Sequence, residues 1–151
     1  MAGVKLQEIK MAAGDDVYRE AQARLHRILG SYLSMYAWKS GADCVVIQRE
    51  ELLEFLELTR MKNVRVDWIK EDLKHLFRYA KTTVYSDSGN YAELYLSRTK
   101  FPKGICDEPL KTEQRIEKFK AHGLKLVDVS LPSEHELVSK MALILTGIGN
   151  M

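Results

Sequence analysis

Basic side chains are concentrated in one short stretch of this 151-residue sequence. Between residues 60 and 81 seven arginines and lysines face three acids, a net charge of +4, whereas the whole chain carries +2. The seven are Arg60, Lys62, Arg65, Lys70, Lys74, Arg78 and Lys81. Long cationic side chains can neutralise the phosphates of a nucleic acid and release its counterions. This stretch is therefore a candidate nucleic-acid surface.

The spacing of three of these cations predicts a shared helix face. Lys70, Lys74 and Arg78 follow one another at intervals of four residues, which places them on one side of a helix. Apolar residues at helical spacing occupy the opposite side, namely Ile69, Leu73, Leu76, Phe77 and Ala80. We expect the basic side to face phosphates, with the cations at residues 60, 62, 65 and 81 flanking it.

Some of the same residues could also contact base edges. Arginine and lysine suit guanine, and asparagine suits adenine. Asn63, Arg65 and Lys70 are therefore candidates for base contacts at the start of the predicted helix. The alternative interpretation is an ordinary solvated face, because lysine and arginine are common on the outer side of helices.

The acidic segment 48–58 argues against DNA binding. It holds Glu50, Glu51, Glu54 and Glu57 against Arg49 alone, a net charge of −3. A phosphate backbone would repel these carboxylates. Either this side points away from DNA, or the chain is a protein-interaction module of replication or transcription machinery.

Residues capable of catalysis do not form a recognisable motif. The four histidines, His26, His75, His122 and His135, are scattered, and we expect His26 and His135 to lie on the surface. Cys44 and Cys106 lack the spacing of a zinc site, and Cys44 is expected to be a small buried residue. No phosphate-binding glycine loop, metalloprotease motif or serine nucleophile motif is present. We expect a non-catalytic protein with no metal and no cofactor.

The elements that must position the basic stretch follow from periodicity. A long helix is predicted over 15–39, with Gly30 marking a close helix contact, and then a buried strand over 44–47. A second helix over 48–58 precedes a third over 68–80, for which Asp67 is the predicted N-cap. Strands over 82–86 and 91–97 flank a turn-forming sequence, which predicts a β-hairpin.

This order of helix, strand, helix, helix and hairpin over residues 15–97 resembles the winged helix-turn-helix superfamily. The resemblance implies an α+β fold in which the third helix, 67–80, lies in the DNA major groove. It also implies that the hairpin, 81–97, is a wing whose tip, including Asn90, contacts the DNA backbone. The segment 59–65 departs from the pattern, since it is longer than a tight helix-turn-helix turn.

The sequence predicts three regions. A flexible tail covers 1–14, a winged-helix domain 15–103, and a helix–strand–helix extension 104–151. In the extension, helices are predicted over 109–122 and from about residue 133 onward, with a strand over 124–130. The last helix has a wide apolar face that must be covered, either by the helix 15–39 or by a second copy in a homodimer. Its predicted dimerisation residues are Leu137, Met141, Ile144, Leu145 and Ile148.

The composition of the chain indicates the cellular compartment and the kind of organism from which it comes. The chain has no 18-residue apolar run and two cysteines, and we expect a reduced cytoplasmic protein with no signal peptide and no membrane contact. Asparagine and glutamine together number seven, a scarcity that favours a thermophilic source. The sequence as a whole predicts a double-stranded DNA-binding transcriptional regulator that acts as a homodimer.

Overall fold

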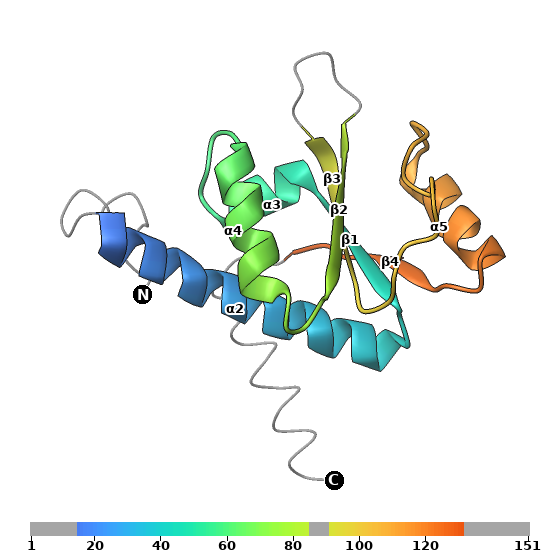
Figure 1. The fold of residues 1–151 in the computed structure, drawn as a ribbon, viewed down its shortest axis with the longest axis horizontal. Helices are drawn as coiled ribbons and strands as arrows, with labels where there is room; N and C mark the ends of the chain where they lie inside the picture. Colours follow the sequence, from blue (N-terminus) through green and yellow to red (C-terminus); the bar gives the residue numbers. More distant parts are fainter. Residues whose placement is uncertain (1–14, 85–90, 132–151) are drawn as a thin grey trace, which may run out of the picture.

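The computed structural model describes residues 15–84 and 91–131, which form an α+β fold (Figure 1). The predicted fold class is confirmed at this level. In chain order the elements are α2 (Asp15–Ser40), β1 (Cys44–Gln48), α3 (Arg49–Phe55), α4 (Asn63–Leu73), β2 (Tyr79–Val84), β3 (Tyr91–Ser97), α5 (Thr112–Ala121) and β4 (Leu126–Asp128).

The strands form one mixed sheet in the order β2-β3-β1-β4. Strand β3 is antiparallel to both of its neighbours, so Ser97 lies between Tyr79 of β2 and Cys44 of β1. Strand β4 pairs with β1 in parallel and begins opposite Cys44 at Leu126. Residues from the predicted extension therefore share a sheet with the predicted winged-helix region.

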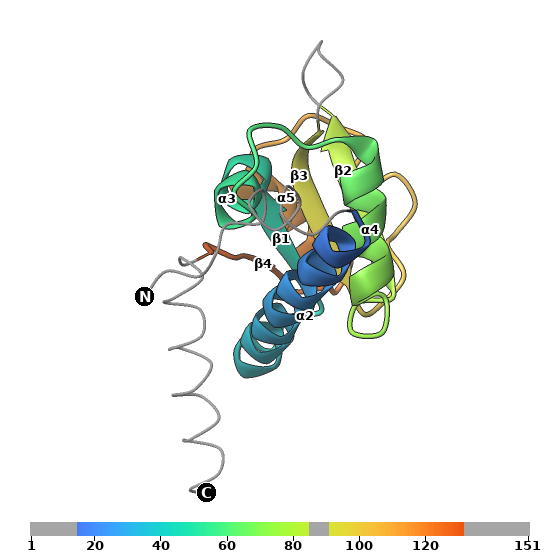
Figure 2. The ribbon, with the colours of Figure 1, turned by 90° about the vertical axis from the view of Figure 1, so that its left-hand side faces the viewer.

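Both faces of the sheet are covered by helices, which explains the continuous apolar run in β1. Val45 and Ile47 point into a core shared with α2, α3 and α4. Cys44 and Val46 point the other way, into a smaller core that contains Phe119 of α5. Figures 1 and 2 show α5 on the side of the sheet opposite α2 and α4.

Helices α2 and α4 approach each other closely at Gly30. A Cβ atom on Gly30 would lie 2.3 Å from Cδ2 of Leu73, which is closer than side-chain carbons can come. Leu73 is fully buried and has little room to move. The expected close helix contact at Gly30 is confirmed, and it fixes the position of α4 on α2.

The predicted bounds of the third helix are wrong at both ends. Helix α4 begins at Asn63, with Lys62 rather than Asp67 as the N-cap, so Val66 is already helical where it enters the core. The helix ends at Leu73, and the turn that follows buries Phe77. Strand β2 then starts at Tyr79, because its pairing with β3 extends as far as Ser97.

Other differences are smaller. The second helix ends at Phe55 instead of 58, and Glu57 takes a positive φ of 56° in the loop that follows. Helix α5 and strand β4 are shorter than predicted, at 112–121 and 126–128. The expected tail 1–14, the hairpin turn 85–90 and the last helix lie outside the described residues. None of the described helices is both long enough and apolar enough to cross a bilayer.

Candidate functional site

The outward face of α4 carries balanced charge rather than a basic stripe. Asp67 and Glu71 are exposed on it beside Lys70 and Lys74. The Lys74 ammonium lies 2.7 Å from the Glu71 carboxylate, although both side chains remain well exposed. Arg78 lies beyond the end of the helix, so the prediction that residues 70, 74 and 78 share one helix face is wrong. The helix surface alone is therefore a weak electrostatic site.

The third acid of the segment, Asp72, turns toward α2. Its two carboxylate oxygens each accept a hydrogen bond of 3.0 Å from Arg19, and one lies 2.7 Å from Nδ1 of His26. Burial alone would raise the pKa of Asp72, but the hydrogen bonds from Arg19 and His26 outweigh it and lower the pKa. His26 is completely buried, so its predicted surface position is wrong.

Arg65 is also drawn inward, away from a base-contacting position. Its side chain is 7% exposed, and one guanidinium nitrogen donates to the Tyr18 hydroxyl at 2.7 Å. The other terminal nitrogen donates to the side-chain oxygen of Gln22. The sequence contained no local signal for this burial, because both partners lie more than 40 residues earlier on α2.

A strongly basic hollow lies beside β2, which is an edge strand of the sheet in the described part of the chain. We call it the edge hollow. Its volume is about 660 Å³, and its lining is Arg78, Tyr79, Ala80, Lys81, Lys100, Phe101 and Lys103. Four of these seven residues are cations and none is an acid. The arrangement suits a polyanion.

Two cations of the edge hollow lie over its aromatic rings. The guanidinium of Arg78 lies 5.7 Å from the centre of the Tyr79 ring, and the ammonium of Lys81 lies 5.8 Å from that of Phe101. The residues predicted from the sequence did not include Lys100 and Lys103, which belong to a connector after β3. The signal was the short segment 100–103, in which two lysines flank a phenylalanine and a proline.

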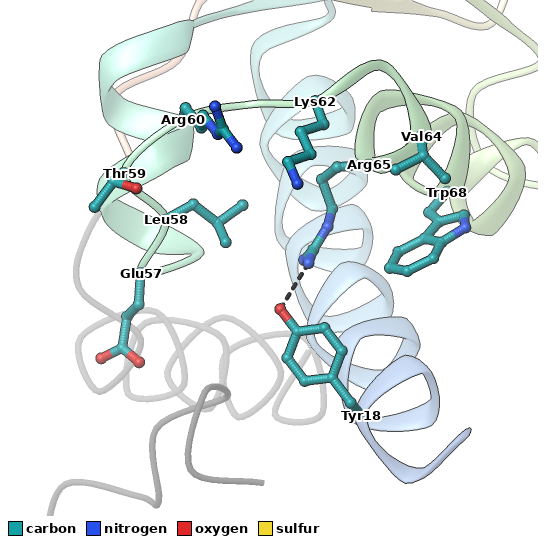
Figure 3. A pocket seen from close by; sticks show the side chains of 9 residues that line it. All are labelled: Tyr18, Glu57, Leu58, Thr59, Arg60, Lys62, Val64, Arg65 and Trp68. Carbon is teal, nitrogen blue, oxygen red and sulfur yellow. Dashed lines mark hydrogen bonds between the residues drawn. The ribbon is translucent and has the colours of Figure 1, made fainter. Parts of the chain in front are cut away.

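A second pocket lies at the opposite end of α4 (Figure 3). We call it the α4 pocket. Its volume is about 370 Å³, and its lining is Tyr18, Glu57, Leu58, Thr59, Arg60, Lys62, Val64, Arg65 and Trp68. Of the predicted cations, Arg60, Lys62 and Arg65 line this pocket, Arg78 and Lys81 line the edge hollow, and Lys70 and Lys74 line neither. An 11-residue helix separates them, a length of roughly 16 Å.

Asn63 is exposed at the first position of α4. Asn90 and the five predicted dimerisation residues of the last helix lie outside the described residues. Glu50 and Glu54 of α3 are exposed, and so is Glu57 in the loop that follows the helix. The Glu50 carboxylate lies 2.7 Å from the Arg49 guanidinium. The hydrogen bond from Arg49 is the main cause of a lowered pKa at Glu50.

The described residues contain no cluster of three or more histidines, cysteines or acids able to hold a metal. Both cysteines are free and buried, as expected for Cys44. Burial raises the pKa of both thiols, which keeps them protonated at neutral pH.

Comparison with known proteins identified no relative. No protein-family model, no curated protein and no solved structure matches the chain. The residues of the two hollows and their charges are therefore the basis on which a function can be assigned.

Proposed function

We propose that this chain is a winged-helix protein that binds double-stranded DNA without catalysing a reaction, as a transcriptional regulator does. The order of elements from α2 to β3 supports this proposal. So does the sheet, in which β1 pairs with the second strand of the hairpin formed by β2 and β3. In this arrangement α4 is the recognition helix and the β2–β3 hairpin is the wing.

The edge hollow is the observation that carries the proposal. Four cations and no acid line it, and its lining begins at Arg78, just before β2 in the segment that follows α4. A phosphate backbone that passes the end of the recognition helix would meet these side chains. Because the α4 face is balanced in charge, the phosphate contacts come mainly from the residues at its two ends.

Salt-dependent binding of a random DNA duplex tests the proposal. The duplex is about 30 base pairs, or roughly three helical turns. Fluorescence anisotropy is followed from about 50 to 200 mM salt. The test variant, Lys100→Ala/Lys103→Ala, removes two exposed cations from the edge hollow. The control, Lys39→Ala/Lys120→Ala, removes two exposed cations from the ends of α2 and α5.

We expect the wild type and the control to bind with a steep dependence on salt. The test variant should bind more weakly, and its slope of log affinity against log salt should be smaller by about 1 for each lysine that contacts phosphate. Equal losses in the two variants would mean that the edge hollow has no special role. Absence of binding at low salt would contradict the proposed function.

Homodimer formation through the apolar segment 137–148, for which the sequence predicts a helix, is part of the proposal, because two recognition helices could then occupy half-sites about 34 Å apart. Sedimentation equilibrium tests this by measuring the mass of the wild type and of the variant Met141→Lys/Leu145→Lys. A dimer that the variant converts to a monomer supports the assignment. A monomeric wild type contradicts it.

A second candidate function is docking onto another protein. Trp38, near the end of α2, is 65% exposed, and large exposed aromatic side chains are frequent in protein interfaces. The exposed acids of α3 also fit a basic protein surface better than DNA. Failure of the duplex experiment at low salt would favour this alternative.

A further inference from the structure

The guanidinium of Arg65 is a buried positive charge, and its hydrogen-bond partners among the described residues are neutral. Its hydrogen-bond acceptors are the hydroxyl of Tyr18 and the side-chain amide of Gln22. No carboxylate in the described parts of the chain forms an ion pair with it. The neighbouring Arg19 differs, because Asp72 binds it through both oxygens. Burying a charge without a counter-ion is costly, so an external anion would be favoured here.

Arg65 opens onto the α4 pocket together with two exposed cations. Arg60 and Lys62 line the same space, and no ion pair with a described residue occupies either. In Figure 3 Lys62 is drawn between Arg60 and Arg65, and the guanidinium of Arg65 is directed to the Tyr18 hydroxyl. Glu57 is the acid of the lining, and its carboxylate points away from these cations.

The backbone adds to this positive field. The first turn of α4 borders the pocket, and the positive end of the helix dipole lies there. Lys62 is the N-cap, no side chain caps the helix, and the first turn contains no acid. The free N–H groups of a helix start can bind phosphate oxygens. The start of α4 therefore favours an anionic ligand, as the three cationic side chains do.

The aromatic side of the pocket indicates recognition by charge rather than by stacking. The guanidinium carbons of Arg19 and Arg65 lie 4.8 and 5.1 Å from the centre of the Trp68 ring. The indole already holds two cations, and Tyr18 is engaged by Arg65. A volume of about 370 Å³ is at the lower end of the range for small-molecule sites.

We propose that the α4 pocket is a phosphate-binding site, in which Arg60, Lys62 and Arg65 hold a phosphate group at the start of α4. The phosphate belongs either to a small free molecule or to the DNA backbone. A small phosphate ligand at this site would not require the proposed DNA binding, because the pocket lies at the other end of α4 from the edge hollow, whereas a backbone phosphate at this site rests on the proposed function.

Trp68 provides a direct probe, since the chain has two tryptophans and the other, Trp38, is on the surface. In a Trp38→Phe background, Trp68 emission is recorded during titration with sodium phosphate and, at matched ionic strength, with sodium chloride. Titration calorimetry of the wild type with sodium phosphate gives a second measurement. Lys62→Ala is the test variant because its side chain is exposed and its loss should not prevent folding. Lys70→Ala, on the same helix but outside the pocket, is the control.

We expect phosphate, but not chloride, to change Trp68 emission saturably and to release or absorb heat. Loss of one charge-assisted contact in Lys62→Ala should weaken phosphate affinity by roughly tenfold. Lys70→Ala should bind phosphate as the background protein does. The proposal is overturned if neither phosphate nor the duplex changes Trp68 emission or releases heat. It is also overturned if Lys62→Ala and Lys70→Ala behave alike in both titrations.

A titration with the DNA duplex distinguishes the two phosphate sources. If free phosphate binds saturably and competes with the duplex, the pocket accepts phosphate from both sources. If free phosphate binds and does not compete with the duplex, the pocket binds a small molecule. If the duplex alone changes Trp68 emission, and Lys62→Ala weakens that change, the site binds a backbone phosphate. Phosphate binding in a protein that binds no duplex contradicts the proposed function and leaves the phosphate site in place.

Discussion

The imidazole of His26 is completely buried, and its Nδ1 lies 2.7 Å from a carboxylate oxygen of Asp72. Nδ1 donates a proton to Asp72, whereas Nε2 is buried and has no hydrogen-bond partner among the described residues. A second proton, on Nε2, would place a charge in the core and leave a buried N–H donor without an acceptor among the described residues. Burial is accordingly the main reason why the pKa of His26 falls from 6.5 to about 4.

This histidine should make folding sensitive to mild acid. Below pH 6.5 the unfolded chain takes up a proton at His26 while the folded protein does not, so stability falls until about pH 4. The loss is on the order of 3 kcal/mol across that window, from the difference between 6.5 and about 4. Urea unfolding at several pH values measures it. In His26→Gln the slope between pH 6.5 and 4 should flatten, whereas the exposed His122→Gln should keep the wild-type slope. An unchanged slope in His26→Gln would refute this prediction.

Gly30 gives a prediction about packing between helices. Alanine is the better helix former by about 1 kcal/mol, which alone would stabilise the protein. The added methyl group would instead meet Leu73 at 2.3 Å, in a core with no space to receive it. We expect Gly30→Ala to lower the free energy of unfolding by about 1 to 3 kcal/mol, as overpacking does. Urea unfolding of Gly30→Ala and of its neighbour Ser31→Ala checks this. Ser31→Ala should change little, and a Gly30→Ala protein as stable as the wild type would contradict the close contact.

The two thiols should be unreactive in the folded protein. Cys44 is completely buried, Cys106 is 8% exposed, and burial raises the pKa of both. The thiolate is the reactive form, so both burial and protonation protect them. An aromatic disulfide reagent at neutral pH should label neither cysteine in native protein and both after unfolding in urea. An exposed cysteine introduced as Lys120→Cys provides the positive control. Rapid labelling of a native wild-type thiol would show that the smaller core opens readily.

The sequence predicted those parts of the fold in which local pattern and tertiary structure agree. The apolar run at 44–47 has one satisfactory arrangement, a strand covered on both faces, and it forms β1. The third helix was placed incorrectly because its apolar spacing continues by chance into Phe77 and Ala80. Pairing with β3 takes Ala80 into β2, and no helical pattern can reveal that requirement.

The candidate site depended even more on long-range contacts. Lys100 and Lys103 join Arg78 and Lys81 because β3 returns the chain to the start of β2. Arg65 is buried because Tyr18 and Gln22 lie opposite it on α2. A count of charges located the basic region of the chain, but it could not separate a surface cation from a buried one.

The ion pair between Lys74 and Glu71 yields a test of how α4 takes part in DNA binding. Glu71 both neutralises Lys74 at 2.7 Å and places a negative charge on the outward face of the helix. Such an exposed pair contributes little to stability, so Glu71→Gln should fold normally. If α4 faces DNA, the substitution removes repulsion from the phosphates and releases Lys74 to contact them. Duplex affinity at low salt should then rise several-fold, by anisotropy. Glu117→Gln, which removes an exposed acid from α5 on the far side of the sheet, should raise affinity less. Equal effects of the two substitutions would mean that only net charge matters and that α4 does not lie at the interface.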